Sequence, residues 1–438
     1  QPPLQKEEIV SAVASGTDLL SELQEDTDYF ENWGEFEEGA IEGIDAFDLL
    51  RPIYGNFKKY MGRFSPRLAL GGTVSVAGFL TRHWFNIHYQ TNFLMLCIAP
   101  PGAGKNRTKE LVQRILSAEH YAQKNLSDAV CQKIGTAPAL MKFLAERNGV
   151  VLTIIDEFGE YLREIKAKNA SPHRADLEPA IKELYSGSPF SIPVLKGDME
   201  VAKTIANPFF SMMGLGTESI FHFFSKADFI NGFLSRLLIF REPKPGAPLT
   251  FEESTRVSEG EFQLVLPSQA PFVEAVRPQW SKDAQEYFDA FTKLYTKKQH
   301  TIEYDLEKQH LYARLGENAL RLSVLTSNSE GHISLQGMKW AVRLIIDCFQ
   351  SKMTLLNRYF FTGVSQELLE KGLRVIKKIT VKRRSDQVRK SEFMRFANLT
   401  LKEEDLVLKE MEARELINTF VERNTNYKLT QWIRINKT

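Results

Sequence analysis

The sequence has few cysteines and no long apolar run. Its 438 residues include three cysteines, Cys97, Cys131 and Cys348, which lie far apart and form no ligand motif. We therefore expect reduced thiols, and predict neither a disulfide framework nor a zinc site. No apolar stretch is long enough to span a bilayer and no signal peptide is visible, so we expect a soluble, cytoplasmic protein without a membrane partner.

An excess of one sign of charge is also missing, but the balance conceals an asymmetry. The formal net charge is +1. Residues 1–50 contain fourteen acids and only Lys6 as a base, whereas residues 371–390 contain nine Lys and Arg against Asp386. We interpret the acidic stretch as a linker or strap, or as a competitor of DNA for a basic channel. The basic stretch favours a polyanionic partner, with a solvated surface as the alternative.

The stretch that organises the chain is LMLCIAPPGAGKNRT, residues 94–108. An apolar run from Phe93 to Ile98 predicts a buried strand, and a helix-compatible segment follows the glycines. Glycines let backbone N–H groups surround a polyphosphate, the helix N-terminus adds positive potential, and a lysine reaches the outer phosphates. The pattern predicts a phosphate loop that binds ATP through Pro101, Gly102, Ala103, Gly104, Lys105, Asn106 and Arg107. A turn without a ligand is the alternative.

One position departs from the usual phosphate-loop pattern. Asn106 stands where a Ser or Thr hydroxyl normally ligates Mg²⁺. An amide oxygen can also bind Mg²⁺, and Thr108 or a water molecule is an alternative ligand. Nucleotide binding is therefore a firmer prediction than fast hydrolysis.

A second motif, GVVLTIIDE, covers Gly149 to Glu157. A β-branched apolar run that ends in two acids is typical of a buried parallel strand with acids at its carboxyl end. We expect Asp156 to hold Mg²⁺ through water and Glu157 to orient or deprotonate the attacking water. The motif follows the phosphate loop by about 50 residues, which favours a nucleotide-hydrolysing fold.

Three further patterns follow the acidic motif. Residues 190–205 predict a β-hairpin with Lys196 at its turn. The run from Pro208 to Leu215 predicts the next core strand, which places Thr217 near the γ-phosphate. Arg236 precedes another apolar strand, where it would reach the active site of a neighbouring subunit. An ordinary salt-bridged arginine is the alternative.

Helical patterns occupy most of the remaining chain. In the first part they cover residues 66–84, 108–124, 138–147, 158–168 and 172–185, and residues 281–361 are helical throughout. Arg314 and Arg321 fall on one face of the most periodic helix, residues 312–327. Each is expected either to contact phosphate from a lid or to pair on the helix surface.

The C-terminal pattern predicts three short helices followed by two strands. The helices cover residues 368–379, 390–396 and 402–415, and the strands cover residues 419–423 and 427–435. This order suggests a winged-helix module, in which one helix enters a DNA groove and the wing touches phosphates. Winged helices also bind proteins, so both partners stay open.

The order of APPGAGK, IIDEFGEYL, the hairpin, NPFFSMMGLGT and NGFLSRLLIF resembles phage- and plasmid-borne replicative helicase-like ATPases of the AAA+ or superfamily 3 type. The resemblance covers roughly residues 65–435 in layout. It implies that Lys105, Asp156 and Glu157 act on ATP. It also implies that Arg236 is an arginine finger acting in trans, and that Lys196 and Lys203 contact DNA. Thr217 stands where many relatives have Asn.

The resemblance implies an α/β fold with a P-loop AAA+-like ATPase core that carries an inserted β-hairpin, then a helical lid and a C-terminal winged-helix-like domain. The predicted divisions are an acidic extension or linker at 1–60, the ATPase core at 61–245, a linker at 246–275, the lid at 276–362 and the winged-helix-like domain at 363–438.

The function implied is that of an ATP- and Mg²⁺-dependent DNA helicase or translocase. It would act on single-stranded or forked DNA during replication of a phage or mobile element, in a bacterial or phage-infected cell. The resemblance also implies a hexameric ring with ATP between subunits. A primase domain upstream is expected, since the sequence lacks an initiator Met. The alternatives are an ATP-switched replication initiator with little hydrolysis and a DNA-translocating ATPase that does not unwind.

Overall fold

The structure, a computed structural model, divides into two compact units, residues 1–352 (unit 1) and 353–438 (unit 2). Each unit is described by itself. The described residues are 43–82, 90–118, 126–167, 170–191, 204–247, 264–265, 277–301, 306–359, 366–383, 385–413, 417–423 and 429–435.

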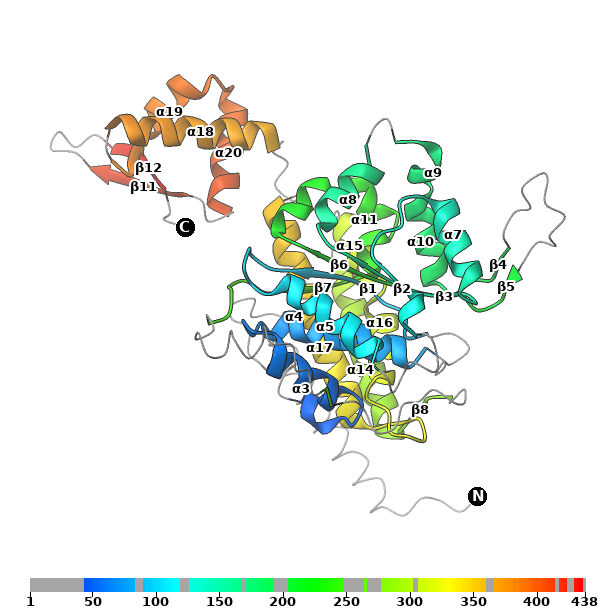
Figure 1. Cartoon of the computed structure of the whole chain (residues 1–438). Helices are drawn as coiled ribbons and strands as arrows, with labels where there is room; N and C mark the ends of the chain where they lie inside the picture. The colour runs from blue at the N-terminus through cyan, green and yellow to red at the C-terminus, as the bar shows by residue number, and fades with distance from the viewer. Residues whose placement is uncertain are drawn as a thin grey trace, which may run out of the picture. The chain divides into compact units, whose positions relative to one another are not determined.

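Unit 1 is built on a parallel five-stranded sheet (Figure 1). Its strands are β1 (Leu94–Ile98), β2 (Val130–Cys131), β3 (Val150–Ile155), β6 (Phe209–Gly216) and β7 (Leu237–Arg241). Their order across the sheet is β2-β3-β6-β1-β7, so β6 separates β1 from β3. Every residue of β1 and β6 is buried, as expected for parallel strands covered on both faces. The α/β class predicted from the sequence is confirmed.

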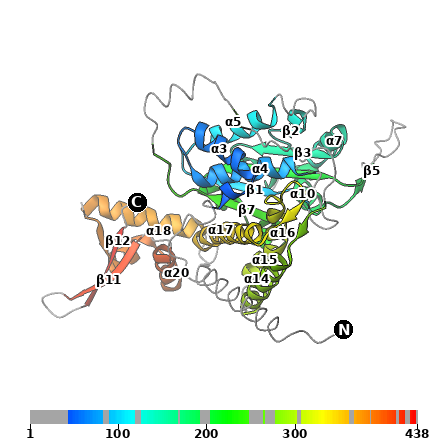
Figure 2. The same cartoon turned by 90° about the horizontal axis from the view of Figure 1, so that it is seen from below.

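Helices cover the two faces of this sheet. On one face α4 (Pro66–Leu80) contacts β1, β6 and β7, and α3 (Leu50–Tyr60) and α5 (Lys105–Leu116) pack beside α4 (Figure 1 and Figure 2). On the other face α8 (Phe158–Ile165) and α10 (Leu177–Tyr185) contact β6. Two further helices, α7 (Ala137–Glu146) and α9 (Pro172–Ala175), complete the connections from β2 to β6.

Several element boundaries differ from the sequence prediction. The helix predicted to begin at Thr108 begins at Lys105, because Gly104 adopts a left-handed conformation that ends the loop. This helix ends at Leu116, and residues 119–125 lie outside the described residues. The two-residue strand β2 was not predicted, because two residues are too few to show a periodic pattern.

The predicted hairpin is described only at its base. The strands β4 (Phe190–Ser191) and β5 (Thr204–Ile205) pair antiparallel, with Phe190 opposite Ile205. Lys196 and Lys203, the expected DNA contacts, lie outside the described residues.

Short helices connect β6 to β7. They are η3 (Glu218–Phe223), a 3₁₀ helix, followed by α11 (Lys226–Ile230) and α12 (Phe233–Arg236). The start of α11 is fixed by a capping box between Ser225 and Asp228. Upstream of α3, the 3₁₀ helix η1 (Ile44–Ala46) opens the described part of the chain.

The segment after residue 277 is mainly helical. It contains α14 (Lys282–Thr301), α15 (Leu306–Tyr312), α16 (Leu315–Val324) and α17 (Leu335–Tyr359). It is not helical throughout, since β8 (Gln279–Trp280) and β9 (His332–Ile333) pair as a small parallel sheet. The segment belongs to unit 1 as far as residue 352, and the finer division into core, linker and lid stays a prediction.

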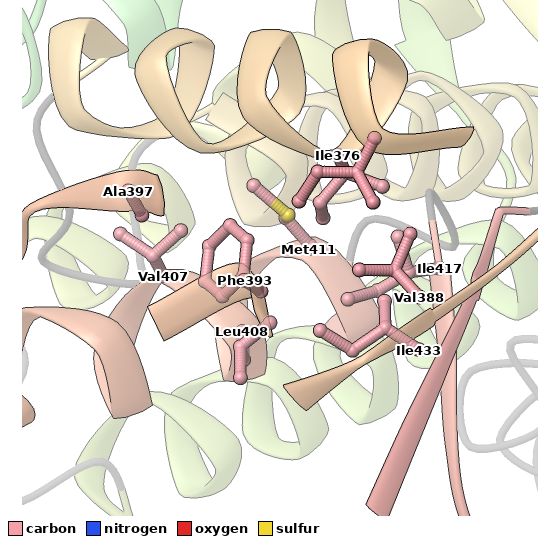
Figure 3. Close-up of a cluster of buried hydrophobic side chains, with 10 residues drawn as sticks. Ile376, Val388, Phe393, Ala397, Val407, Leu408, Met411, Ile417 and Ile433 are labelled. Carbon is pink, nitrogen blue, oxygen red and sulfur yellow. The ribbon is translucent and has the colours of Figure 1, made fainter. Parts of the chain in front are cut away.

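Unit 2 contains three helices and an antiparallel sheet. Its order is α18 (Gln366–Arg383), β10 (Gln387–Arg389), α19 (Lys390–Ala397), α20 (Leu401–Ala413), β11 (Ile417–Arg423) and β12 (Leu429–Ile435). The sheet order is β10-β12-β11. All six elements contribute to one apolar core, in which Phe393 and Met411 lie between the helices, and Ile433 comes from the sheet (Figure 3).

None of the helices in the described ranges is long and apolar enough to cross a bilayer. The three cysteines are free thiols, as predicted.

Candidate functional site

The loop after β1 turns sharply into α5. Gly102 and Gly104 have φ angles of 77° and 93°, in the left-handed region that glycine adopts without strain. Lys105 is the first residue of α5, and the backbone N–H of Thr108 donates to the Gly104 carbonyl at 2.9 Å. The loop therefore brings a helix N-terminus, with its unpaired N–H groups, to the carboxyl edge of the sheet.

Two residues that the sequence analysis did not select support this loop. The Ser65 hydroxyl donates to the Ala103 carbonyl at 2.7 Å, and both residues are buried. Arg63 donates to the Gly102 carbonyl at 3.4 Å. Ser65 directly precedes α4, so the helix that covers the sheet also fixes the loop. Nothing in the local sequence pattern of Ser65 indicates this contact.

The Lys105 ammonium group points into the loop. Its Nζ atom donates to the carbonyl oxygens of Ala99 and Pro100, at 2.8 and 3.1 Å. Burial lowers the pKa of Lys105, while the nearby charges of Glu157 and Asp156 act in the opposite direction. The expected phosphate-binding lysine and the two expected acids therefore share one site.

The two acids follow β3 at the same edge. Asp156 accepts a hydrogen bond from the Glu157 backbone N–H at 3.0 Å. Glu157 has a φ of 51°, which is unusual for a residue with a side chain, and its side chain is exposed at the start of α8. Strained residues of this kind cluster at functional sites. The turn thus presents one carboxylate to solvent and holds the other against the backbone.

A second lysine contacts the acidic pair. The Nζ atom of Lys109 lies 3.5 Å from an Asp156 carboxylate oxygen, and both side chains are partly buried. Lys109 was not among the predicted site residues. Its position one helical turn after Lys105, on the same face of α5, is the signal that identifies it.

The residues near the expected metal position have distinct environments. Asn106 is exposed in the first turn of α5. Thr108 is fully buried, and its hydroxyl donates to the Gly104 carbonyl at 3.1 Å. The alternative that Thr108 ligates Mg²⁺ is therefore wrong, because its hydroxyl lies inside the helix turn. Arg107 forms an ion pair with Glu110 at 2.5 Å.

Thr217 completes the edge between the loop and the acids. It follows β6, the strand between β1 and β3, and its hydroxyl lies 2.7 Å from that of Ser219. The next residue, Glu218, pairs at 2.7 Å with Arg241 at the end of β7. Lys105, Asp156, Glu157 and Thr217 thus lie at one edge of the sheet, as the sequence predicts.

Arg236 lies at the opposite edge. It ends α12 and precedes β7, which runs parallel to β1. Its guanidinium group is partly buried and donates to the Gly232 carbonyl at 2.7 Å. Burial is the main effect that lowers its pKa. The structure therefore does not bring Arg236 to the phosphate loop of its own chain.

The two arginines of α16 also lie away from the loop. Arg321 is 2% exposed and donates to Asn92, which precedes β1, and to the Tyr185 carbonyl at 3.1 Å. Neither expectation for Arg321, a phosphate contact or a surface pair, is correct, because the side chain bridges a helix and the buried amino end of β1. Arg314 pairs with Glu317, in agreement with helix-surface pairing.

The donor set suits a hard cation that keeps most of its water. No group of three or more His, Cys, Asp or Glu side chains converges anywhere in the described ranges. Mg²⁺ in nucleotide sites is commonly held by one or two carboxylates, water and phosphate oxygens. Asp156, with Asn106 nearby in the loop, fits that role.

Comparison with known proteins gives no family. No protein-family model matches the sequence, and no curated protein does. Two solved structures are similar in part. The Aeropyrum pernix ORC1 protein in complex with DNA shares 13% identity at a TM-score of 0.26, with 82% of this chain and 87% of that chain covered.

Drosophila ORC bound to DNA is 12% identical at a TM-score of 0.20, with 85% of this chain and 89% of that chain covered. Likeness at these TM-scores supports no argument about this chain. Its own geometry is the basis for the proposals below.

Proposed function

We propose that this chain is an ATP-driven DNA motor of AAA+ or superfamily 3 type, which binds ATP with Mg²⁺ at the carboxyl edge of its parallel sheet. The single observation that carries the proposal is the convergence of the glycine loop, Lys105 and the Asp156–Glu157 turn at that edge. A loop of backbone N–H donors beside a lysine and two acids is the arrangement that phosphoryl transfer to water requires.

Each residue has a separate role in this proposal. Lys105 exchanges its two carbonyl contacts for oxygens of the β- and γ-phosphates. Glu157, which is exposed at the start of α8, orients the attacking water and accepts its proton. Asp156 and Asn106 hold Mg²⁺ through water, and the metal neutralises charge on the phosphates. Thr217 contacts the γ-phosphate.

The position of Arg236 supports an arrangement with ATP between subunits. Because β7 separates this residue from the carboxyl edge by its five residues, or about 16 Å, its guanidinium group is remote from nucleotide in the same chain. An arginine finger must then serve a neighbouring copy. We propose a ring, with a hexamer as the expected closed assembly.

The DNA part of the proposal depends on two further features. The paired strands β4 and β5 form the base of a hairpin, and the sequence places Lys196 and Lys203 within it. Unit 2 has the helix-strand-helix-helix-strand-strand order of a winged helix, a module that commonly binds DNA. Single-stranded or forked DNA is the proposed substrate, in replication of a phage or mobile element, and a primase domain upstream is part of the same proposal.

The test is steady-state ATP hydrolysis by the purified chain, with and without single-stranded DNA. We expect DNA to stimulate hydrolysis, and Lys196→Ala to remove the stimulation. Glu157→Gln should retain ATP binding and lose hydrolysis by at least about a hundredfold, since it removes the general base. The control is Glu160→Gln, which changes an exposed acid one turn along α8 that pairs with Arg163.

A second candidate function is an ATP-switched initiator with little hydrolysis. Two observations favour it: Asn106 replaces the usual hydroxyl, and the Lys109 ammonium lies 3.5 Å from Asp156. ATP binding without turnover, in the presence of DNA, would select this candidate. DNA-stimulated turnover without strand displacement would instead select a translocating ATPase that does not unwind.

A further inference from the structure

The helices of unit 2 differ sharply in charge. The sequence of α18 contains six Lys and Arg residues and two Glu, whereas that of α20 contains two Lys and five Asp and Glu. In a helix-turn-helix arrangement the helix that enters the DNA groove is the later helix of the pair, which corresponds to α20 here. An acidic helix is repelled by phosphates, so the position of the DNA on unit 2 needs another explanation.

The charges of α18 fall on one side of the helix. The exposed cations are Lys371, Arg374, Lys377, Lys378 and Lys382, which we call the α18 basic face. They recur at intervals of three and four residues, so they line one face over about 16 Å. The other side of α18 packs into the core of unit 2 through Ile376 and Ile379 (Figure 3).

The centre of this face is not neutralised by nearby acids. Within the part of unit 2 that the structure describes, Lys377, Lys378 and Lys382 have no carboxylate within ion-pair distance. By contrast, Arg383 at the end of the helix pairs with Glu392 at 2.8 Å. Like charges placed side by side on a helix repel one another, and a polyanion relieves this repulsion.

The exposed surface of α20 lacks these properties. Asp405 and Glu412 are exposed, and Lys409 is the exposed cation between them. Asp405 pairs with Lys390 at 3.2 Å, and the Glu412 carboxylate accepts a hydrogen bond from the Thr419 backbone at 2.9 Å. These acids are part of the packing between α20 and its neighbours.

We propose that the α18 basic face binds the phosphate backbone of DNA, and that α20 does not enter a groove. The inference rests on the proposed function for DNA as the partner, and adds the surface and its mode of binding. Contacts to phosphates alone carry no base information, so binding by unit 2 is independent of sequence and strongly dependent on salt.

The experiment measures binding of a fluorescent DNA duplex of arbitrary sequence to the full chain, without nucleotide, over a series of salt concentrations. The test variant is Lys377→Gln with Lys378→Gln, both at exposed positions. Loss of two phosphate contacts should make the slope of log affinity against log salt shallower by about 2, for duplexes of any sequence. The matched control, Lys409→Gln on α20, should leave the slope unchanged.

Several results would overturn the inference. One is an unchanged slope in the double variant while Lys196→Ala reduces it, which would retain the proposed motor but place DNA elsewhere. Another is a reduced slope in Lys409→Gln. A third is an effect of the double variant confined to a peptide of residues 1–42, which would make the acidic segment the occupant. Absence of any DNA binding by the wild-type chain would remove both proposals.

Discussion

At the scale of single residues, the site depends on how cations are distributed around two carboxylates. Lys105 is held by two loop carbonyls, and Lys109 faces Asp156. The lysine that faces Asp156 occupies the neighbourhood in which a hydrated Mg²⁺ would lie. Lys109 and the metal therefore compete for one carboxylate, because two cations close together repel each other.

Replacement of Lys109 by Met tests this competition. Loss of the ammonium group should lower the Mg²⁺ concentration needed for half-maximal nucleotide binding by about 2- to 5-fold, as expected for a partly exposed ion pair. Titration of Mg²⁺ at fixed fluorescent ATP measures the effect without hydrolysis. Lys133→Met removes an ion pair with Glu164 elsewhere on unit 1 and serves as the control. A higher Mg²⁺ requirement in Lys109→Met would show that Lys109 assists the metal.

At the scale of elements, the acidic turn is placed by close packing between β6 and α8. Phe158, the first residue of α8, lies directly over Gly214 of β6. A methyl group at Gly214 would lie 2.7 Å from the Phe158 ring and 2.8 Å from Leu96. The missing side chain therefore lets α8 begin immediately after Glu157.

Gly214→Ala should displace α8 and the turn before it. Overpacking of this kind costs about 1–3 kcal/mol of unfolding free energy, and here it should also reduce ATP hydrolysis. Urea unfolding measures the first effect. The matched variant is Gly55→Ala in α3, where an added methyl group has no neighbour within 4 Å. It should be neutral, or stabilising by about 0.5–1 kcal/mol, because alanine favours the helix. Equal stability of the two variants would contradict the packing argument.

At the scale of the whole molecule, unit 1 contains a fully buried lysine in α17. Lys352 is 3% exposed, and burial lowers its pKa from 10.5 to about 8, with Cys348 acting in the opposite direction. A base with a lowered pKa in the folded state destabilises the fold at pH values below that pKa. The penalty is lost as pH rises from about 8 towards the unfolded value.

Lys352→Met should therefore stabilise the protein most near neutral pH. The gain is up to about 3 kcal/mol near pH 7, and it should shrink as pH rises above about 8. Urea unfolding at several pH values gives this difference between wild type and variant. Lys282→Met, at an exposed position in α14, should show no such pH dependence. A gain that stays constant with pH would show that packing, and not charge, is responsible.

The sequence alone predicted the elements whose signal is local. Glycines followed by a lysine predicted the loop, and a β-branched run that ends in two acids predicted β3 and the turn at Glu157. The alternation of these strands with helices predicted an α/β fold. Each signal lies within about ten residues, where period and residue type decide the local structure.

The tertiary structure decided what depends on distant segments. It placed β6 between β1 and β3, brought Ser65 under the loop and set Lys109 against Asp156. It also buried Arg321, which the helical period alone had placed on a surface. Burial and ion pairing depend on which segments meet across the core. These meetings are fixed by packing of the whole chain, and a local pattern carries no record of them.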